Sequence, residues 1–320
     1  MRLVQRESPA PHNYLIAAAG SLLTVMLIVL VATEDVYKAV NVFISLDLTN
    51  MARVFLVVAV IGLASVVSYR AGLWNIGQEG QAVAGALAAL ASQNSAEALA
   101  LGLLAGAAWA AVPTALRVLL DVNEAVSTFL FTFVAIHVAQ HFVEGPLRDL
   151  TRKGFIASVE APHIDLAVAV TVTALFYGLA AAFFRTRHGL MLRLLASGKD
   201  VVKYAGASPK KYAATALALS GMLAGAGGAL EIMSREAGRY MTLQQVSTGF
   251  GLYGISASWL GGLSIYGTLA ASLYIAWLYQ VGINLKIAGL PALVTNALVG
   301  AAMAWGLVGY VLYKYRVVWR

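Results

Sequence analysis

The stretch YLIAAAGSLLTVMLIVLVAT, residues 14 to 33, decides the fold class of this sequence. It carries no charged side chain and has the length that a helix needs to cross roughly 30 Å of hydrocarbon. A backbone inside lipid must satisfy its own hydrogen bonds, which a helix does. The strands of a membrane β-barrel would alternate in polarity over segments of about 10 residues, and this run does not alternate. We therefore predict an all-α integral membrane protein.

The composition of the whole chain agrees with that class. Of its 320 residues, 60% are hydrophobic and 12% are charged, and the mean hydropathy is +0.77, whereas soluble domains are about 25% charged. A formal charge of +7 can indicate nucleic-acid binding, but in a membrane protein the positions of Lys and Arg carry the information. We expect membrane lipid and no nucleic acid as partners. The chain has no cysteine, which excludes disulfides and thiolate chemistry.

Apolar runs separated by polar breaks predict a polytopic bundle of about ten transmembrane helices, with eight as the lower bound, in one domain covering residues 1–320. The third and eighth runs are short for a bilayer, so either they tilt or the adjoining glycine-rich turns lie inside the membrane. The predicted spans are 14 to 33, 51 to 69, 78 to 92, 96 to 119, 122 to 142, 164 to 184, 211 to 232, 246 to 262, 265 to 283 and 288 to 314.

The distribution of Lys and Arg orients the bundle, because inner loops of membrane proteins are enriched in them. With ten spans and an inner N-terminus, 14 of these residues fall on the inner side and 8 on the outer side. Seven of the 14 lie in residues 185–211. We expect a multi-pass protein of the cytoplasmic membrane with both termini, residues 1–13 among them, and the 185–211 loop in the cytoplasm. Residues 143–163 would then form an extracytoplasmic loop.

The basic loop has a pattern that predicts a short helix over residues 190–206. Lys199 and Lys203 would share one side of it, Gly206 can end it, and Ser208-Pro209 can begin the next helix. One interpretation is a solvated loop that only fixes the topology. The other is a docking helix for a cytoplasmic partner. The apolar side of the helix would consist of Leu190, Leu194, Leu195, Val201, Val202 and Tyr204.

Motifs for nucleotide binding, metal binding and catalysis are absent from the sequence or incomplete. No GxxxxGK[ST] run occurs, so the chain has no phosphate cradle of its own, and any ATP and Mg²⁺ would be bound by partner subunits. His137 and His141 lie one helical turn apart, but the glutamate of HExxH and a third ligand are missing, so we expect no metal. No GxSxG nucleophile motif is present. These observations favour a transport protein over an enzyme.

Small residues in SGMLAGAGGAL, residues 220–230, predict close helix packing. Gly221, Gly225 and Gly228 would let a second helix approach where lipid gives no hydrophobic driving force. Glu231 follows this run, and we expect it at the outer interface. An acid at membrane depth would instead be a candidate functional residue.

The stretch RAGLWNIGQEGQAVAGALAAL, residues 70–90, interrupts the apolar chain with polar side chains. Facing lipid would be costly for Asn75, Gln78, Glu79 and Gln81, so they should face the bundle interior or a hydrated path, or else lie in an interfacial turn. A weak internal echo favours the first alternative. Residues 62–77 and 254–267 both run from small residues into a glycine turn, and paired breaks indicate a transporter's central site.

A set of these motifs resembles the permease subunits of ABC importers for nucleosides and simple sugars, a family that also includes branched-chain amino acid permeases. The resemblance covers most of residues 50–285, and its first stretch is most similar to the nucleoside branch. It rests on RAGLWNIGQEGQAVAGALAAL, VNEAVSTFLF (122–131), EGPLRD (144–149), FRTRHGLMLRLLASGKDVVKYAGASPKKY (184–212), ALSGMLAGAGGALEIM and GFGLYGISASWLGGLSIYGTLAASLY (249–274).

The resemblance implies a type II-like importer in which two permease subunits, identical or diverged, bind two cytoplasmic ATPases. An extracytoplasmic binding protein would deliver the substrate. Residues 185–211 match the family's ATPase-coupling segment, although Lys199-Asp200 stands where the family more often has Glu-Asn or Asn-Pro. The coupling residues implied are Arg193, Ser197, Gly198, Lys199, Asp200, Tyr204 and Gly206, and the expected substrate-pathway residues are Asn75, Gln78, Glu79 and Gln81.

Two other kinds of transport remain open at this point. An ion-driven secondary transporter or a channel would share the helical composition and explain the polar breaks equally well, but it would need no docking helix. Within the ABC interpretation, the substrate could be a branched-chain amino acid instead of a nucleoside or sugar.

Overall fold

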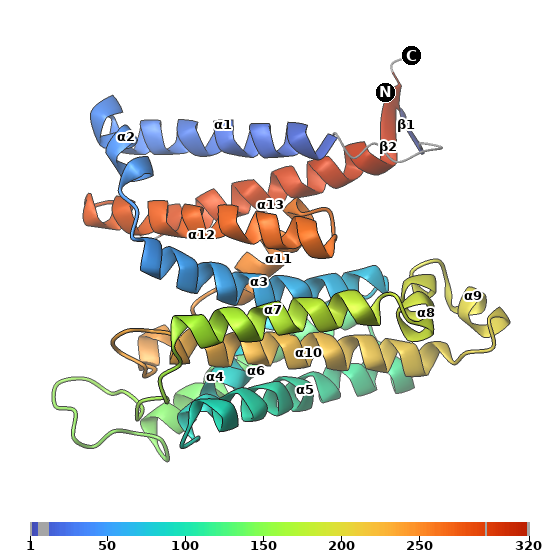
Figure 1. Cartoon of the computed structure of the whole chain (residues 1–320), viewed down its shortest axis with the longest axis horizontal. Coiled ribbons are helices and arrows are strands. Elements are labelled where there is room, and N and C mark those ends of the chain that lie inside the picture. The colour runs from blue at the N-terminus through green and yellow to red at the C-terminus, as the bar shows by residue number, and fades with distance from the viewer. Residues whose placement is uncertain (1, 6–12, 292, 319–320) are drawn as a thin grey trace. The chain divides into compact units, whose positions relative to one another are not determined.

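The computed structural model describes residues 2–5, 13–291 and 293–318, and most of them are helical (Figure 1). The short strands β1 (Arg2–Gln5) and β2 (Tyr315–Val318) pair antiparallel. The helices are α1 (Asn13–Thr33), α2 (Val36–Ile44), α3 (Leu48–Arg70), α4 (Gln78–Leu90), α5 (Ser95–Leu120), α6 (Glu124–Glu144), α7 (Leu166–Phe183), α8 (Arg187–Leu195), α9 (Lys199–Tyr204), α10 (Pro209–Met233), the 3₁₀ turn η1 (Leu243–Gln245), α11 (Phe250–Leu260), α12 (Ile265–Ile287) and α13 (Leu293–Lys314).

Each of the ten predicted spans corresponds to a helix, and every predicted end lies within five residues of the observed one. Within the described residues, seven helices are long and apolar enough to cross a membrane, namely α1, α3, α5, α6, α7, α10 and α13. The all-α, multi-pass class is therefore confirmed, while the number of crossings and the side of each terminus stay predictions. Most of the N-terminal segment 1–13 lies outside the described residues.

The chain divides into two compact units, Met1–Phe55 with Ser256–Arg320, and Leu56–Ile255. In the first unit α1 packs against α13, and a Cβ on Gly20 would lie 2.5 Å from the Trp305 ring. The sequence analysis missed α2, a nine-residue helix that Asp35 caps by accepting two backbone N–H groups. Asn284 of α12 holds the C-terminal end of α2 by donating to the carbonyls of Val42 and Ser45.

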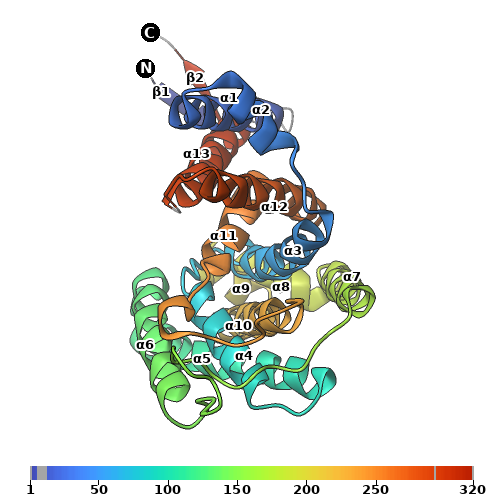
Figure 2. The same ribbon diagram turned by 90° about the vertical axis from the view of Figure 1, so that its left-hand side faces the viewer.

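The second unit is built around α10, which packs against α4 and α5 (Figure 2). The backbones touch along this seam, because a Cβ on Gly225 would collide with the carbonyl of Gly102 on α5. A Cβ on Gly228 would collide with Ala82 on α4, and one on Gly221 would lie 2.6 Å from Gly106. The seam leaves no room for a methyl group, so the three helices form one closely packed frame.

The prediction of one helix over residues 190–206 is wrong, because α8 and α9 are separated. Gly198, at φ +133°, lies in a conformation that L-residues rarely adopt and that breaks the helix. The predicted apolar side is also divided: Val202 is fully buried, with Leu194 and Leu195 packed nearby, whereas Tyr204 is 93% exposed. Leu190 and Val201 are also exposed. Gly206 follows α9 with φ +73°, and Ser208 caps α10 with Pro209 in its first turn.

Candidate functional site

A non-helical segment, residues 71–77, separates α3 from the short helix α4. Helix α3 ends when the N–H of Leu73 donates to the carbonyl of Ser68, with Gly72 at φ +72°. The backbone beyond this turn is held by side chains of α6. The N–H of Trp74 donates to Glu124 at 3.1 Å, and the N–H of Ile76 donates to Thr128 at 3.1 Å.

Asn75 is the centre of a buried polar cluster at the end of this segment. Its amide nitrogen donates to Gln81 and to the hydroxyl of Ser220, both at 2.9 Å. Its amide oxygen accepts from Gln81 at 3.1 Å and from the N–H of Gly77 at 3.2 Å. Asn75 is fully buried and Gln81 is 1% exposed. One side chain thus joins the unwound segment to α4 and α10.

Gln78 begins α4 and is fully buried beside α3. Its amide oxygen accepts a hydrogen bond from Ser65 at 2.7 Å. Its amide nitrogen has no hydrogen-bond partner among the described residues. A buried donor without a partner costs about 1–3 kcal/mol, so a polar group that met this nitrogen would be stabilising.

Glu79 connects the N-terminal ends of two short helices. It lies in the first turn of α4, and its carboxylate accepts from the hydroxyl of Ser247 at 2.5 Å. It also accepts from the N–H groups of Gly249 at 2.8 Å and Gly251 at 2.6 Å, where α11 begins. A negative charge at the N-terminus of a helix is stabilised by the helix dipole. The carboxylate therefore serves both helix ends, and Glu79 is only 6% exposed.

These polar residues lie inside the second unit and not in a turn at its end. A Cβ on Gly77 would collide with Thr128, and one on Gly80 would lie 2.7 Å from Thr132. Thr128 and Thr132 are four and eight residues into α6, which is about 6–12 Å along its axis. The expectation of an interior position thus agrees with the geometry, while a role in transport stays a prediction.

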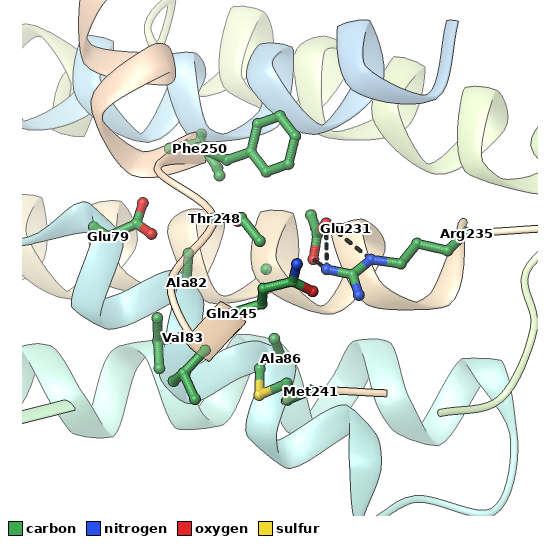
Figure 3. Close-up of a pocket in the computed structure, with 13 residues that line it drawn as sticks. Glu79, Ala82, Val83, Ala86, Glu231, Arg235, Met241, Gln245, Thr248 and Phe250 are labelled. Carbon is green, nitrogen blue, oxygen red and sulfur yellow. Dashed lines mark hydrogen bonds and ion pairs between the residues drawn. The ribbon is translucent and has the colours of Figure 1, made fainter. Parts of the chain in front are cut away.

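A narrow cavity adjoins Glu79. Figure 3 shows Glu79 on one side, the Glu231–Arg235 pair on the other, and Gln245 and Thr248 between them. The volume that the centre of a water molecule can occupy is about 10 Å³, which is room for about one water. Pockets for small molecules enclose about 300–1,000 Å³. In this conformation the cavity is closed to a solute of that size.

Glu231 lies at the far end of this cavity and is buried, with 5% exposure. The Arg235 guanidinium binds both of its carboxylate oxygens, at 2.8 and 3.0 Å. Arg235 also donates to the carbonyls of Gly238 and Tyr240. The sequence analysis placed Glu231 at an interface and did not single out Arg235. The pair neutralises the acid and fixes the start of the segment that leads to α11.

The long loop between α6 and α7 is bound to that same segment. The N–H of Ser158 donates to the carbonyl of Met241 at 2.9 Å, and the N–H of Ala161 donates to Arg239 at 2.7 Å. Ala157 and Thr242 face each other as an isolated antiparallel pair. Glu160 adds an ion pair with Arg239 at 3.1 Å. Residues 157–161 therefore hold one end of the connecting segment 234–249, which contains η1 and whose other end binds Glu79.

Comparison with known proteins identifies the family. The family model described as "Branched-chain amino acid transport system / permease component" matches residues 48–312. The chain belongs to this family. Permeases of this kind are transport subunits and work with ATP-binding and substrate-binding partners.

Three curated relatives of the permease have named substrates. The glucose ABC transporter permease TsgB13 of Haloferax volcanii is 29% identical, over 80% of this chain and 74% of its own length. The guanosine permease NupP of Bacillus subtilis is 27% identical over 74% of each chain. The nucleoside permease NupB of Lactococcus lactis is 24% identical, over 78% of this chain and 76% of its own. A solved structure of PsaBC from Streptococcus pneumoniae matches this chain with a TM-score of 0.46 and 13% identity. The match covers 88% of this chain and 94% of the PsaBC chain, and it is too distant to align individual residues.

The expected coupling residues of the permease form a second group, separate from the polar cluster. They lie on and beside α8 and α9, next to the C-terminal end of α5 and the start of α10 (Figure 1). Lys199 donates to Asp121 at 2.9 Å, and this hydrogen bond holds the pKa of the Asp121 carboxyl below its ordinary value. Arg193 donates to the carbonyl of Phe184 at 3.4 Å. Gly198 breaks the helix, as described above, and Tyr204 is exposed, available to a partner.

Several residues of the site escaped the sequence analysis. Glu124 and Thr128 lie within a motif that carried the family resemblance, but their backbone partners are about 50 residues earlier in the chain. Ser220 and Ser247 are hydroxyls in apolar or glycine-rich surroundings with no local signal of their role. Among the searched residues no group of three His, Asp or Glu side chains is placed to hold a metal.

Proposed function

We propose that the permease is the membrane-spanning subunit of an ATP-driven importer of nucleosides in the cytoplasmic membrane. It would work with two ATP-binding subunits, which bind ATP and Mg²⁺ and hydrolyse the nucleotide. A second permease subunit and an extracytoplasmic substrate-binding protein would complete the transporter. The guanosine and nucleoside transport of two relatives supports this substrate class, and the glucose permease keeps a simple sugar as the nearest other substrate.

The meeting of α4 and α11 at Glu79 carries this proposal. The cavity beside it is lined by carboxylate, amide and hydroxyl side chains and by the aromatic residue Phe250. Such groups can exchange hydrogen bonds with the hydroxyls of a neutral sugar ring, and an aromatic ring can stack on a base. The cavity is too small for a nucleoside as it stands, so passage requires Ser247, Gly249 and Gly251 to move away from Glu79.

Helix α10 provides a mechanical connection from the cytoplasmic partner to this site. Its first turn follows α9 after the short connection 205–208, Ser220 in its middle binds Asn75, and Glu231 near its end lines the cavity. We expect ATP binding to move α8 and α9 with the ATPases, and α10 to carry that movement to the cluster. No bond in the substrate changes.

Substrate competition in whole cells tests the proposed function. Uptake of labelled guanosine should be competed by unlabelled uridine and not by leucine or glucose. It should stop when the ATP-binding subunits are inactivated and continue when an ionophore collapses the ion gradients. Competition by leucine would overturn the substrate class. Uptake by the purified permease alone in liposomes with an ion gradient would overturn the ATP-driven mechanism.

A further inference from the structure

A second cavity, which contains none of the residues of the polar cluster, lies between α9, the end of α5 and the start of α10. Its volume is about 560 Å³, within the range of sites that hold a small molecule or a headgroup. Its walls also include Leu73 beyond α3 and Leu195 of α8. The cavity therefore forms where five elements of the second unit meet.

The polar lining of this cavity is predominantly cationic. Four basic side chains face one carboxylate, and the residues are Arg117, Lys199, Lys203, Lys210 and Asp121. Lys199 and Arg117 share Asp121, each at 2.9 Å. Lys203 binds the exposed Asp200, and Arg117 also binds Glu124. Lys210 is in no ion pair among the described residues.

Two further features make the cavity favourable for an anion. The first turn of α10, which borders it, contains Lys210 and Lys211 and no acidic residue, so its dipole is not neutralised. The pairs of Asp121 with Lys199 and of Asp200 with Lys203 are exposed, and such pairs are worth only about 0–1 kcal/mol. These lysines can turn to a stronger acceptor such as a phosphate at small cost.

Exposed apolar side chains lie in and beside the lining of this cavity. Leu119 lines the cavity and is 72% exposed, and Leu120 next to it is 69% exposed. Val122 and Val126, at the start of α6, are exposed as well. Apolar residues beside a ring of cations are typical of the boundary between acyl chains and headgroups. The cavity thus combines cationic and exposed apolar side chains, the pairing that a phospholipid headgroup and its acyl chain require.

We propose that this cavity binds the phosphate headgroup of an anionic phospholipid. Lys203 and Lys210 contact the phosphate, the α10 N-terminus faces it, and one acyl chain lies along Leu119 and Leu120. A free phosphate would use the same cations but would leave the two leucines without a partner. An acidic side chain of an ATP-binding subunit would likewise gain nothing from them. The observations therefore favour an amphiphile.

Lipid titration of the full-length permease tests this inference without measuring transport, so it stands or fails separately from the importer function. Purified protein is titrated with dioleoyl phosphatidylglycerol or dioleoyl phosphatidylcholine, and native mass spectrometry counts the bound lipids. Phosphatidylglycerol should bind more tightly, and salt should weaken it. Lys203→Gln with Lys210→Gln should weaken it about 25-fold, or about fivefold for each lysine. Both side chains are exposed, so folding should be unaffected.

A matched control variant removes the same charge elsewhere. Lys38→Gln with Lys286→Gln alters α2 and α12 and should leave phosphatidylglycerol affinity unchanged. Equal affinity for the two lipids, or equal loss in both variants, would overturn the site. Glycerol phosphate binding as tightly as phosphatidylglycerol would show a free-anion site instead. If K203Q/K210Q releases the ATP-binding subunits from the assembled transporter but keeps the lipid, the surface belongs to that partner and the inference is wrong.

Discussion

Two glycine turns of this permease begin in the same way and end differently. In SYRAGL, residues 68–73, the N–H of Leu73 donates to Ser68 and that of Gly72 donates to Tyr69. In SWLGGL, residues 258–263, the N–H of Leu263 donates to Ser258 and that of Gly262 donates to Trp259. Both are the six-residue C-terminal cap that glycine favours. The internal echo in the sequence therefore has a counterpart in local structure.

The two segments differ immediately after the cap. Ser264 caps the next helix itself, by accepting from the N–H of Gly267, and α12 begins at Ile265. Residues 74–77 stay non-helical, and side chains of α6 bind their backbone. A turn that satisfies its own backbone is a connector. A turn that depends on distant side chains can change its partners, and that is what a moving site requires.

The largest effect should come from locking the segment that leads to α11. The natural chain has no cysteine, so Ala157→Cys with Thr242→Cys adds the only thiols, at a pair of facing residues within disulfide range. Oxidation should abolish uptake and reduction should restore it. Each single cysteine variant should transport normally under both conditions. Full uptake by the oxidised double variant would show that this segment does not move.

Replacing Asn75 after the first turn should reduce stability and uptake more than replacing Ser264 after the second turn. Asn75→Ala leaves Gln81, Ser220 and the N–H of Gly77 without their partner, which should cost about 2–4 kcal/mol and most of the uptake. Ser264→Ala removes one helix cap, worth about 1 kcal/mol, and should leave uptake intact. Thermal unfolding in detergent and uptake in cells measure the two effects. Equal losses of stability would contradict the distinction.

A smaller effect should follow Glu79→Gln, which keeps the shape of the side chain and removes its charge. An amide has one oxygen to offer where the carboxylate uses two, so it cannot accept from Ser247, Gly249 and Gly251 together as well. We expect uptake to fall about tenfold, with membrane insertion unchanged. Glu97→Gln, at an exposed turn of α5, is the control. Uptake at the original rate in E79Q would make the carboxylate purely structural.

The helices could be predicted from the sequence because lipid demands long apolar runs, and ten runs were visible. Helix α2 was missed because it is short and amphipathic, although Asp35 was visible as its cap. The break at Gly198 was missed because the apolar residues on both sides fit one helix. In each case the local sequence pattern was compatible with more than one structure, and tertiary packing determined which one forms.

The polar side chains of the site could be predicted because a polar side chain that faces lipid is energetically unfavourable. Their partners were not, because hydrogen bonds such as Asn75–Ser220 and Glu79–Gly251 join residues 145 and 172 positions apart. A single sequence contains no spacing rule for such pairs. Serine and threonine are also ordinary in membrane helices, so Thr128 and Ser247 carry no signal by themselves.

The seam of α10 with α4 and α5 has a consequence for redesign. The glycines of this seam have no room for a Cβ, whereas the side chains of Gln245 and Thr248, which also line the cavity, make no hydrogen bond within the described part of the chain. On the substrate pathway proposed above, redesign of the solute preference should therefore begin with those two positions. The glycines that pack α10 against α4 and α5 can then stay unchanged in variants designed for different solutes.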